Sequence, residues 1–261
     1  MSTEMAYGIH AVRALLERHP DRVREVSIVR EREDPRARQL ETLARERAIA
    51  VRRVEAEVLR RRVGDAAHQG VIAEITPLAP WSEDDLLSAL ERTADPLILA
   101  LDGVQDPHNL GACLRCADAC GALAVVAPRD RAARLTPAAR KVAAGAAEST
   151  PFVACTNLAR TLRLLKQAGL WIHGADAEAS VPAYEADMTG GTVLVLGAEG
   201  GGLRQLTRQG CDFLVRLPRL GAVESLNVSV AAGMLLYEAA RQRALRQAAI
   251  RSQGAQPGPS A

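Results

Sequence analysis

The chain has 261 residues, of which 48% are hydrophobic, so it can bury a sizeable core in one or two domains. No run approaches the roughly 18 apolar residues of a membrane span, and no charged-then-apolar leader opens the chain, so we expect a cytoplasmic protein without a membrane partner. The formal net charge of +2 is too small to indicate a nucleic-acid partner, five cysteines argue against a disulfide framework, and 3% aromatic residues argue against a base-stacking platform.

The first 76 residues are predicted to form a small α/β domain. Apolar residues at positions 9, 12, 15 and 16 keep helical spacing, and further helices are expected over 36–47 and 55–62. Short apolar runs predict strands over 26–29, 48–54 and 71–75. Arginines gather at positions 52, 53, 60, 61 and 62. A solvated helix face is the simpler interpretation of this cluster, and a phosphate-contacting patch is the alternative.

A proline-rich segment, Thr76-Pro77-Leu78-Ala79-Pro80, interrupts the pattern, so we place a domain boundary there and assign residues 77–95 to a linker and a helix. Strand patterns follow over 97–101, 123–127, 152–155, 170–174, 193–196 and 213–217, and helical patterns over 110–120, 137–147, 158–168 and 228–243. This alternation predicts a parallel sheet covered on both faces, in a domain over residues 96–249. Residues 250–261 form a tail that is expected to be disordered, since it is rich in Pro, Gly, Ser and Gln from Ser252 onwards.

Polar segments follow two of the predicted strands. Gly197-Ala198-Glu199-Gly200-Gly201-Gly202 follows the strand over 193–196, and its spacing matches neither a dinucleotide fingerprint nor a phosphate loop. So many glycines permit close backbone approach, so we expect a ligand against this backbone rather than a plain turn. Ser225 and Asn227 stand where the cap of the last helix is expected. Both segments are expected at one edge of the predicted sheet, and open α/β sheets bind ligands at such an edge. Glu199 is the one side chain of the glycine loop that can act chemically.

Three further groups on the predicted helix over 110–120 and its entry allow more than one interpretation. Cys113, Cys116 and Cys120 fall at i, i+3 and i+7 without a second ligand pair, so they are interpreted as packed small hydrophobes, and no metal site is predicted. His108 could act as a base or make a structural hydrogen bond. Arg115 lies outside the apolar stripe, and its spacing favours a surface ion pair with Asp118.

Three ordered motifs resemble those of the SpoU (TrmH-type) RNA 2′-O-ribose methyltransferases. They are Asp106–Gly111 with Arg115, then Leu196–Gly200, and then Ser225–Ser229. The opening Tyr7–Val12 and the turn His68–Gly70 resemble the substrate-binding domain of that family, which is similar to ribosomal protein L30e. The resemblance covers almost the whole chain. It is strongest to the branch that methylates a guanosine in the peptidyl-transferase region of 23S rRNA.

The resemblance implies an α/β knot domain of the SPOUT type over 96–249, an RNA substrate-binding domain over 1–76, S-adenosylmethionine as methyl donor, 23S rRNA as substrate, and a homodimer with its site at the subunit interface. By motif match it assigns a catalytic set and a cofactor-binding set. The catalytic residues are Arg115, Asn109, Glu199, Asn227 and Ser225, and the cofactor-binding residues are Leu196, Gly197, Gly200, Leu217, Leu226 and Asn227. Arginine is a poor proton acceptor at neutral pH, so we expect Arg115 to grip an RNA phosphate and orient the ribose.

Two alternatives stay open at the level of sequence. A tRNA 2′-O-methyltransferase of the same family is one, although the N-terminal domain favours rRNA. A catalytically silent RNA-binding protein that assists ribosome assembly is the other, although such a protein would not need Asn109, Arg115, Glu199 and Asn227 together. Gly201 and Cys116 depart from the residues common in the family, and neither is a motif residue.

Overall fold

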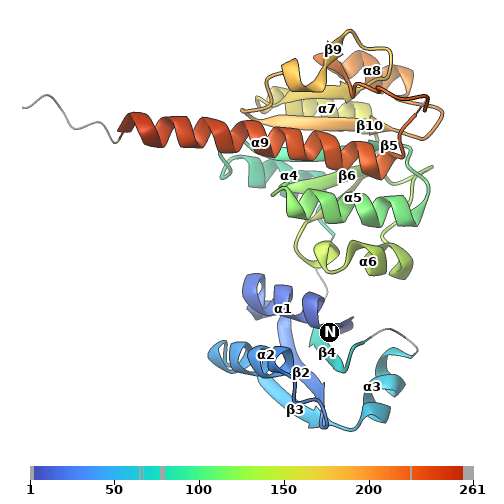
Figure 1. Cartoon of the computed structure of the whole chain (residues 1–261). Helices are drawn as coiled ribbons and strands as arrows, with labels where there is room; N and C mark the ends of the chain where they lie inside the picture. Colours follow the sequence, from blue (N-terminus) through green and yellow to red (C-terminus); the bar gives the residue numbers. More distant parts are fainter. Residues whose placement is uncertain (1–2, 65, 67, 77–79, 224, 255–261) are drawn as a thin grey trace, which may run out of the picture. The chain divides into compact units, whose positions relative to one another are not determined.

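The computed structural model describes residues 3–64, 66, 68–76, 80–223 and 225–254 (Figure 1). These residues fall into two compact units, which divide between residues 76 and 80. The short segment Ala143–Ser149 belongs to the first unit, and the rest of the chain beyond residue 80 forms the second. The predicted assignment of 1–76, 77–95 and 96–249 to separate functional roles stays a prediction.

The first unit is built on a four-stranded sheet in the order β1-β4-β2-β3. Strand β4 is antiparallel to both of its neighbours, whereas β2 and β3 are parallel. The apolar face of α1 enters the core as its spacing predicts, since positions 9, 12, 15 and 16 are all buried. The strand β1 was not predicted, because its Met-Ala centre carries no β-branched pattern. The strands are β1 (Glu4–Tyr7), β2 (Val23–Val29), β3 (Ala50–Val54) and β4 (Val71–Ile75), and the helices are α1 (Ile9–Arg18), η1 (Pro20–Arg22), α2 (Pro35–Glu46) and α3 (Ala56–Val63).

The arginine cluster of the first unit is a paired surface. Each of its members lies within 4 Å of a carboxylate, as in the ion pairs of Arg52 with Glu25 at 2.7 Å and of Arg53 with Glu41 at 2.6 Å. The arginines of α3 pair with Glu57 and Glu25. This arrangement favours the solvated-face interpretation over the phosphate patch.

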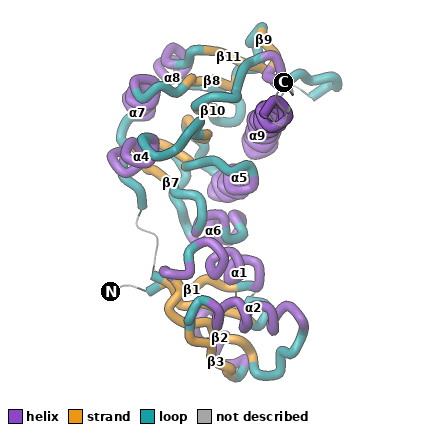
Figure 2. Tube along the Cα trace, turned by 90° about the vertical axis from the view of Figure 1, so that its left-hand side faces the viewer, coloured by secondary structure: helices purple, strands orange, loops and turns teal. Residues whose placement is uncertain are grey.

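The second unit contains a seven-stranded sheet in the order β7-β6-β5-β10-β8-β11-β9, and every adjacent pair is parallel. Strand β10 lies between β5 and β8, so the chain inserts a late strand between two earlier ones, as the predicted knot requires. Helices α5 and α9 lie together on one face, and α4, α7 and α8 on the other (Figure 2). The strands are β5 (Leu97–Asp102), β6 (Ala124–Pro128), β7 (Phe152–Cys155), β8 (Trp171–Ala175), β9 (Val181–Pro182), β10 (Thr192–Gly197) and β11 (Phe213–Arg216).

The helices of the second unit differ from the prediction at several ends. Helix α5 begins at Pro107, because the Asp106 carboxylate accepts the backbone N–H of His108 at 2.9 Å, so Asn109 lies in a first helical turn and not in a loop. Helix α6 ends at Ala143 and not at residue 147, because positive φ angles of 52° at Ala144 and 97° at Gly145 break it. The helices are α4 (Glu83–Leu90), α5 (Pro107–Ala119), α6 (Pro137–Ala143), α7 (Leu158–Gln167), α8 (Gln205–Gly210) and α9 (Val228–Gly254), with a short 3₁₀ turn at η3 (Ala183–Glu185). The 3₁₀ turn η2 (Ala146–Glu148) belongs to the first unit.

The C-terminal helix is longer than expected. Helix α9 continues past Arg243 to Gly254, so the first residues of the predicted disordered tail are helical, and residues 255–261 lie outside the described part of the chain. Arginine and alanine are strong helix formers, and they dominate residues 240–251. Strand β9, turn η3 and helix α8 were also not predicted. No helix in the described part of the chain has both the length and the apolar character that crossing a bilayer requires.

Candidate active site

A hydrogen-bond network joins the three sequence motifs at the carboxyl edge of the second sheet. The Oε1 atom of Glu199 accepts the side-chain amide of Asn227 at 2.6 Å, the backbone N–H of Val228 at 3.2 Å and the side-chain amide of Asn109 at 3.3 Å. The Asn227 amide also donates to Oδ1 of Asn109 at 3.0 Å. One carboxylate therefore connects the start of α5, the loop after β10 and the start of α9.

Asn227 also caps α9, as its position in the sequence predicts. Its Oδ1 accepts the backbone N–H of Ser229 at 2.9 Å and that of Val230 at 3.4 Å, and the Ser229 hydroxyl donates to it at 2.6 Å. These bonds satisfy N–H groups that the first turn of a helix leaves without partners. The oxygen of Asn227 thus holds the helix while its nitrogen holds Glu199, which fixes the side chain in one orientation.

The glycine loop after β10 is a tight turn. Ala198 and Gly202 exchange two backbone hydrogen bonds, of 3.2 Å and 2.9 Å. A Cβ atom at Gly197 would collide with the backbone of Gly202, and Gly200 and Gly202 adopt positive φ angles of 76° and 61°. Three of the four glycines therefore serve the turn itself, which sequence reasoning had attributed to ligand contact. Only Gly201 has neither a positive φ nor a close neighbour.

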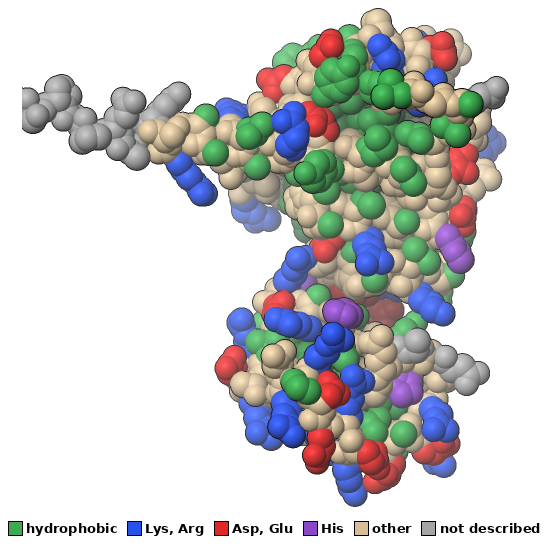
Figure 3. All heavy atoms as spheres, viewed as in Figure 1, with side chains coloured by type: hydrophobic (Ala, Val, Ile, Leu, Met, Phe, Trp, Pro, Cys, Tyr) green, Lys and Arg blue, Asp and Glu red, His purple; other side chains and the backbone are tan. Residues whose placement is uncertain are grey.

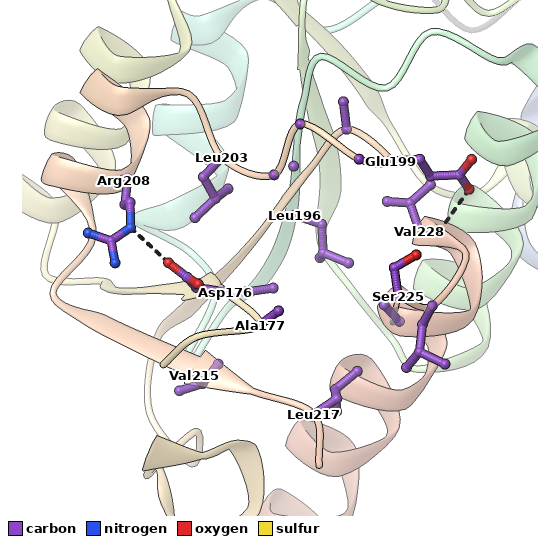
Figure 4. A pocket seen from close by; sticks show the side chains of 18 of the residues that line it. Asp176, Ala177, Leu196, Glu199, Leu203, Arg208, Val215, Leu217, Ser225 and Val228 are labelled. Carbon is purple, nitrogen blue, oxygen red and sulfur yellow. Dashed lines mark hydrogen bonds and ion pairs between the residues drawn. The ribbon is translucent and has the colours of Figure 1, made fainter. Parts of the chain in front are cut away.

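A cavity of about 510 Å³ opens beside this turn (Figure 4). Most of the residues predicted for the cofactor line it, together with two of the predicted catalytic residues: Leu196, Gly197, Gly200, Leu217 and Leu226 of the former, and Glu199 and Ser225 of the latter. Asn109 and Asn227, which was also predicted to bind the cofactor, are not among the lining residues but hydrogen-bond to Glu199. Sequence reasoning missed the opposite wall, which is formed by the end of β8 and by residues of α8 and the loop after β11: Ala175, Asp176, Ala177, Arg208 and Arg219.

The opposite wall carries an ion pair. The Asp176 carboxylate accepts the backbone N–H of Glu178 at 2.9 Å and pairs with Nε of Arg208 at 2.7 Å, as the dashed line in Figure 4 marks. The Glu178 N–H and the Arg208 guanidinium lower the pKa of Asp176, so this carboxylate is charged at neutral pH. The cavity lining therefore combines leucine side chains with charged groups, namely Glu199 on one side and the Asp176–Arg208 pair on the other.

Contacts between Asp102 and Arg204 hold the C-terminal end of the glycine loop. Asp102, buried at the end of β5, accepts the backbone N–H of Arg204 at 2.8 Å, and its other oxygen lies 3.6 Å from the Arg204 guanidinium. The guanidinium lies over Gly103, where a Cβ atom would be only 3.0 Å from it. Asp102 was not singled out from the sequence, since a lone aspartate at a strand end carries no spacing signal.

Arg115 is exposed on α5, and within the described chain no ion pair joins it to Asp118. The Asp118 carboxylate accepts the Thr150 hydroxyl at 3.3 Å instead, so the predicted surface pair is wrong. Arg115 is not among the residues that line the cavity, and within the described chain no hydrogen bond joins it to Glu199, Asn109 or Asn227. His108 is exposed in the first turn of α5.

The cysteines of α5 behave as packed hydrophobes. Cys113 is fully buried, and burial raises its pKa to about 12, while burial also raises the pKa values of Cys116 and Cys120. Among the residues that the structure describes, no three His, Cys, Asp or Glu side chains are grouped as metal ligands.

Two family models match the chain. The SpoU rRNA Methylase family matches residues 96–237, and the RNA 2′-O ribose methyltransferase substrate binding model matches residues 5–81. Two similar proteins are named 23S rRNA (guanosine-2′-O-)-methyltransferase RlmB. The protein of Pseudomonas syringae pv. tomato is 53% identical over 245 residues, which cover 94% of this chain and 98% of that one, and the protein of Escherichia coli is 49% identical over 241 residues, which cover 92% and 99%.

A similar solved structure is the SpoU methyltransferase AviRb from Streptomyces viridochromogenes in complex with the cofactor AdoMet. It matches with a TM-score of 0.70 and 25% sequence identity, over 93% of this chain and 91% of that chain.

Proposed function

The chain belongs to the SpoU rRNA methylase family, and on that premise we propose that it methylates the ribose 2′-hydroxyl of a guanosine in 23S rRNA with S-adenosylmethionine. The predicted fold class and enzyme class are confirmed by the family and by its solved relatives. The observation that carries the proposal is the Glu199 network, because it brings all three family motifs to the mouth of one cavity.

The cavity suits the cofactor. Its volume of about 510 Å³ lies within the range of small-molecule sites, and it combines an apolar lining with a few polar groups. Leu196, Leu217 and Leu226 would hold the flat adenine, and the backbone at Gly197 and Gly200 would approach it closely. Asn227 would act through Glu199. When bound, S-adenosylmethionine supplies an electrophilic methyl group on its sulfonium sulfur.

The protein has to position and polarise a ribose hydroxyl, which is a weak nucleophile on its own. An arginine side chain is a poor proton acceptor, so we assign Arg115 to the RNA phosphate, where its planar fork of donors orients the ribose. Three donors occupy Oε1 of Glu199, and its Oε2 makes no hydrogen bond in the described part of the chain. We assign Oε2 to the substrate, with Asn109 and Ser225 as positioning groups.

An exposed hydrophobic stripe on α9 supports the proposal that the chain forms a homodimer. Val230, Met234 and Tyr237 fall at i, i+4 and i+7, and all three are exposed although they are large and hydrophobic. Figure 3 shows hydrophobic side chains over this helix. Such a stripe on a long helix is typical of a surface that packs against another helix, and a second copy of α9 offers the matching surface.

The rRNA substrate is favoured over tRNA by the N-terminal unit. The substrate-binding family model matches residues 5–81, and the relatives named for 23S rRNA span nearly the whole chain. A 23S rRNA substrate supports the proposal that the enzyme acts in the cytoplasm. The intact set of Asn109, Arg115, Glu199 and Asn227 favours an enzyme over a silent assembly factor.

Methyl transfer from labelled S-adenosylmethionine to purified 23S rRNA, 16S rRNA and tRNA tests the proposal. We expect label on one guanosine ribose of 23S rRNA, which resists alkaline cleavage. Label on tRNA alone would reassign the substrate to the family alternative. Tight RNA binding without transfer to any of the three RNAs would favour the assembly factor.

A further inference from the structure

A second cavity, of about 920 Å³, lies on the second unit and takes no part in the proposed reaction. It is formed by β8, β9, β11, the segment between β8 and β9, residues 185–187 at the end of η3, Asp212, and Arg208 of α8. Arg208 also lines the cofactor cavity, so one ion-paired side chain separates the two spaces. We call this space the aromatic cavity.

Three of its rings pack in series, with Phe213 stacked on His173 and tilted by 48° against Trp171. The Phe213 ring lies 5.6 Å from that of Trp171 and 5.1 Å from that of His173, as measured between centroids. Trp171 is 55% exposed and Phe213 46%, and Tyr184, in the adjoining turn η3, is 57% exposed. Three of the chain's seven Trp, Tyr and Phe residues thus lie open to solvent in this region. Burial lowers the pKa of His173, so the floor beneath Phe213 is a neutral ring.

The charges that remain unpaired around the rings are negative. Arg208 is paired with Asp176 at 2.7 Å, and Asp212 is paired with Lys166 at 2.6 Å. The carboxylates of Glu178 and Glu185 are exposed, and within the described chain neither has an ion-pair partner. The aromatic cavity therefore attracts cations and repels the phosphates of RNA.

We propose that the aromatic cavity docks an arginine side chain that a basic protein segment presents. A guanidinium is planar and weakly hydrated, so it stacks on Trp and Phe faces, and its five donors match free carboxylates. Lysine carries a strongly hydrated point charge, which stacks less well. The partner is a basic protein segment and not RNA, because the unpaired groups on the cavity rim are acceptors with negative charge.

Tryptophan fluorescence can test this docking in the full-length chain. The chain has two tryptophans, so Trp81→Phe leaves Trp171 as the only reporter. In this background we expect nona-arginine to change the emission saturably, and nona-lysine to need at least about threefold higher concentration. Phe213→Ala, and separately Glu178→Gln with Glu185→Gln, should raise the nona-arginine midpoint about tenfold or more.

A matched control removes the same charge elsewhere. Glu31→Gln with Glu33→Gln alters two exposed carboxylates of the first unit and should leave the midpoint within about twofold. An equal effect of this control pair would show nonspecific attraction and overturn the proposal. An unchanged nona-arginine midpoint in the Glu178→Gln, Glu185→Gln variant would also overturn the proposal. This variant decides the test even if Phe213→Ala folds poorly. Binding of an RNA oligonucleotide that Phe213→Ala abolishes, or loss of dimers in that variant, would assign the cavity to another occupant.

Discussion

Replacing Gly197 by alanine should weaken cofactor binding by opening the turn after β10. The new Cβ would collide with the Gly202 backbone, which cannot move away while Ala198 and Gly202 keep their two hydrogen bonds of 3.2 Å and 2.9 Å. Each bond contributes about 0.5 to 1.5 kcal/mol net, so losing both costs about 1 to 3 kcal/mol. That cost corresponds to about a 5- to 150-fold loss of affinity if the cofactor binds only the closed turn.

Isothermal titration with S-adenosylmethionine measures this loss, and Gly201→Ala is the matched control. Gly201 has no positive φ and no atom within 4 Å of an added Cβ, so its variant should bind within about twofold of the parent protein. Equal losses in both variants would mean that the glycines exist for close ligand contact and not for the turn. Unchanged affinity in Gly197→Ala would refute the steric reasoning altogether.

Four other changes test separate parts of the account. Arg115→Ala should lower kcat about 100-fold or more at saturating RNA, and Arg115→Lys should give a kcat between those of the parent and the alanine variant. Full turnover in the alanine variant would exclude a role of Arg115 in positioning the ribose. The Arg243 guanidinium donates hydrogen bonds to the backbone carbonyls of four residues outside α9. Arg243→Ala should therefore lower the free energy of unfolding, measured in urea, by at least about 3 kcal/mol. A loss below about 1 kcal/mol would contradict this anchoring role. The pKa of Asp176 is lower in the folded than in the unfolded chain, so the charged carboxylate stabilises the fold above the unfolded pKa, and this stabilisation is lost as pH falls through the folded pKa. Asp176→Asn should therefore flatten the pH dependence of the melting temperature below about pH 4. An unaltered pH profile would contradict this contribution of Asp176. Met234→Glu should convert dimers to monomers in sedimentation velocity, whereas Arg251→Glu at the far end of α9 should not.

Much of the site could be predicted because its signals are local. Glu199 lies three residues after the apolar run over 193–196, and parallel strands end at a common edge, so their loops were expected to meet. Asn227 was expected to cap α9, and its Oδ1 accepts the first N–H groups of that helix. The sequence could not indicate that the other end of the same amide would hold Glu199, because that contact depends on how α9 packs against β10.

The residues of the opposite cavity wall, and whether Arg115 pairs with Asp118, could not be predicted for similar reasons. Asp176 meets Arg208 only because β8 and β11 are neighbours in the sheet, although the residues are 32 positions apart. The i+3 spacing of Arg115 and Asp118 permits an ion pair but does not require one, and Asp118 accepts a hydrogen bond from Thr150 in another segment. Composition likewise averages over the chain, so a low aromatic content could not indicate that exposed rings gather around Phe213.

The most direct test of the central claim is the ribose methylation of 23S rRNA in cells that lack this chain. Mapping of alkali-resistant positions should show one guanosine that loses its 2′-O-methyl group in the deletion strain. The parent gene should restore that group and the Arg115→Ala variant should not. A 23S rRNA whose methylation pattern is identical with and without the chain would contradict the account.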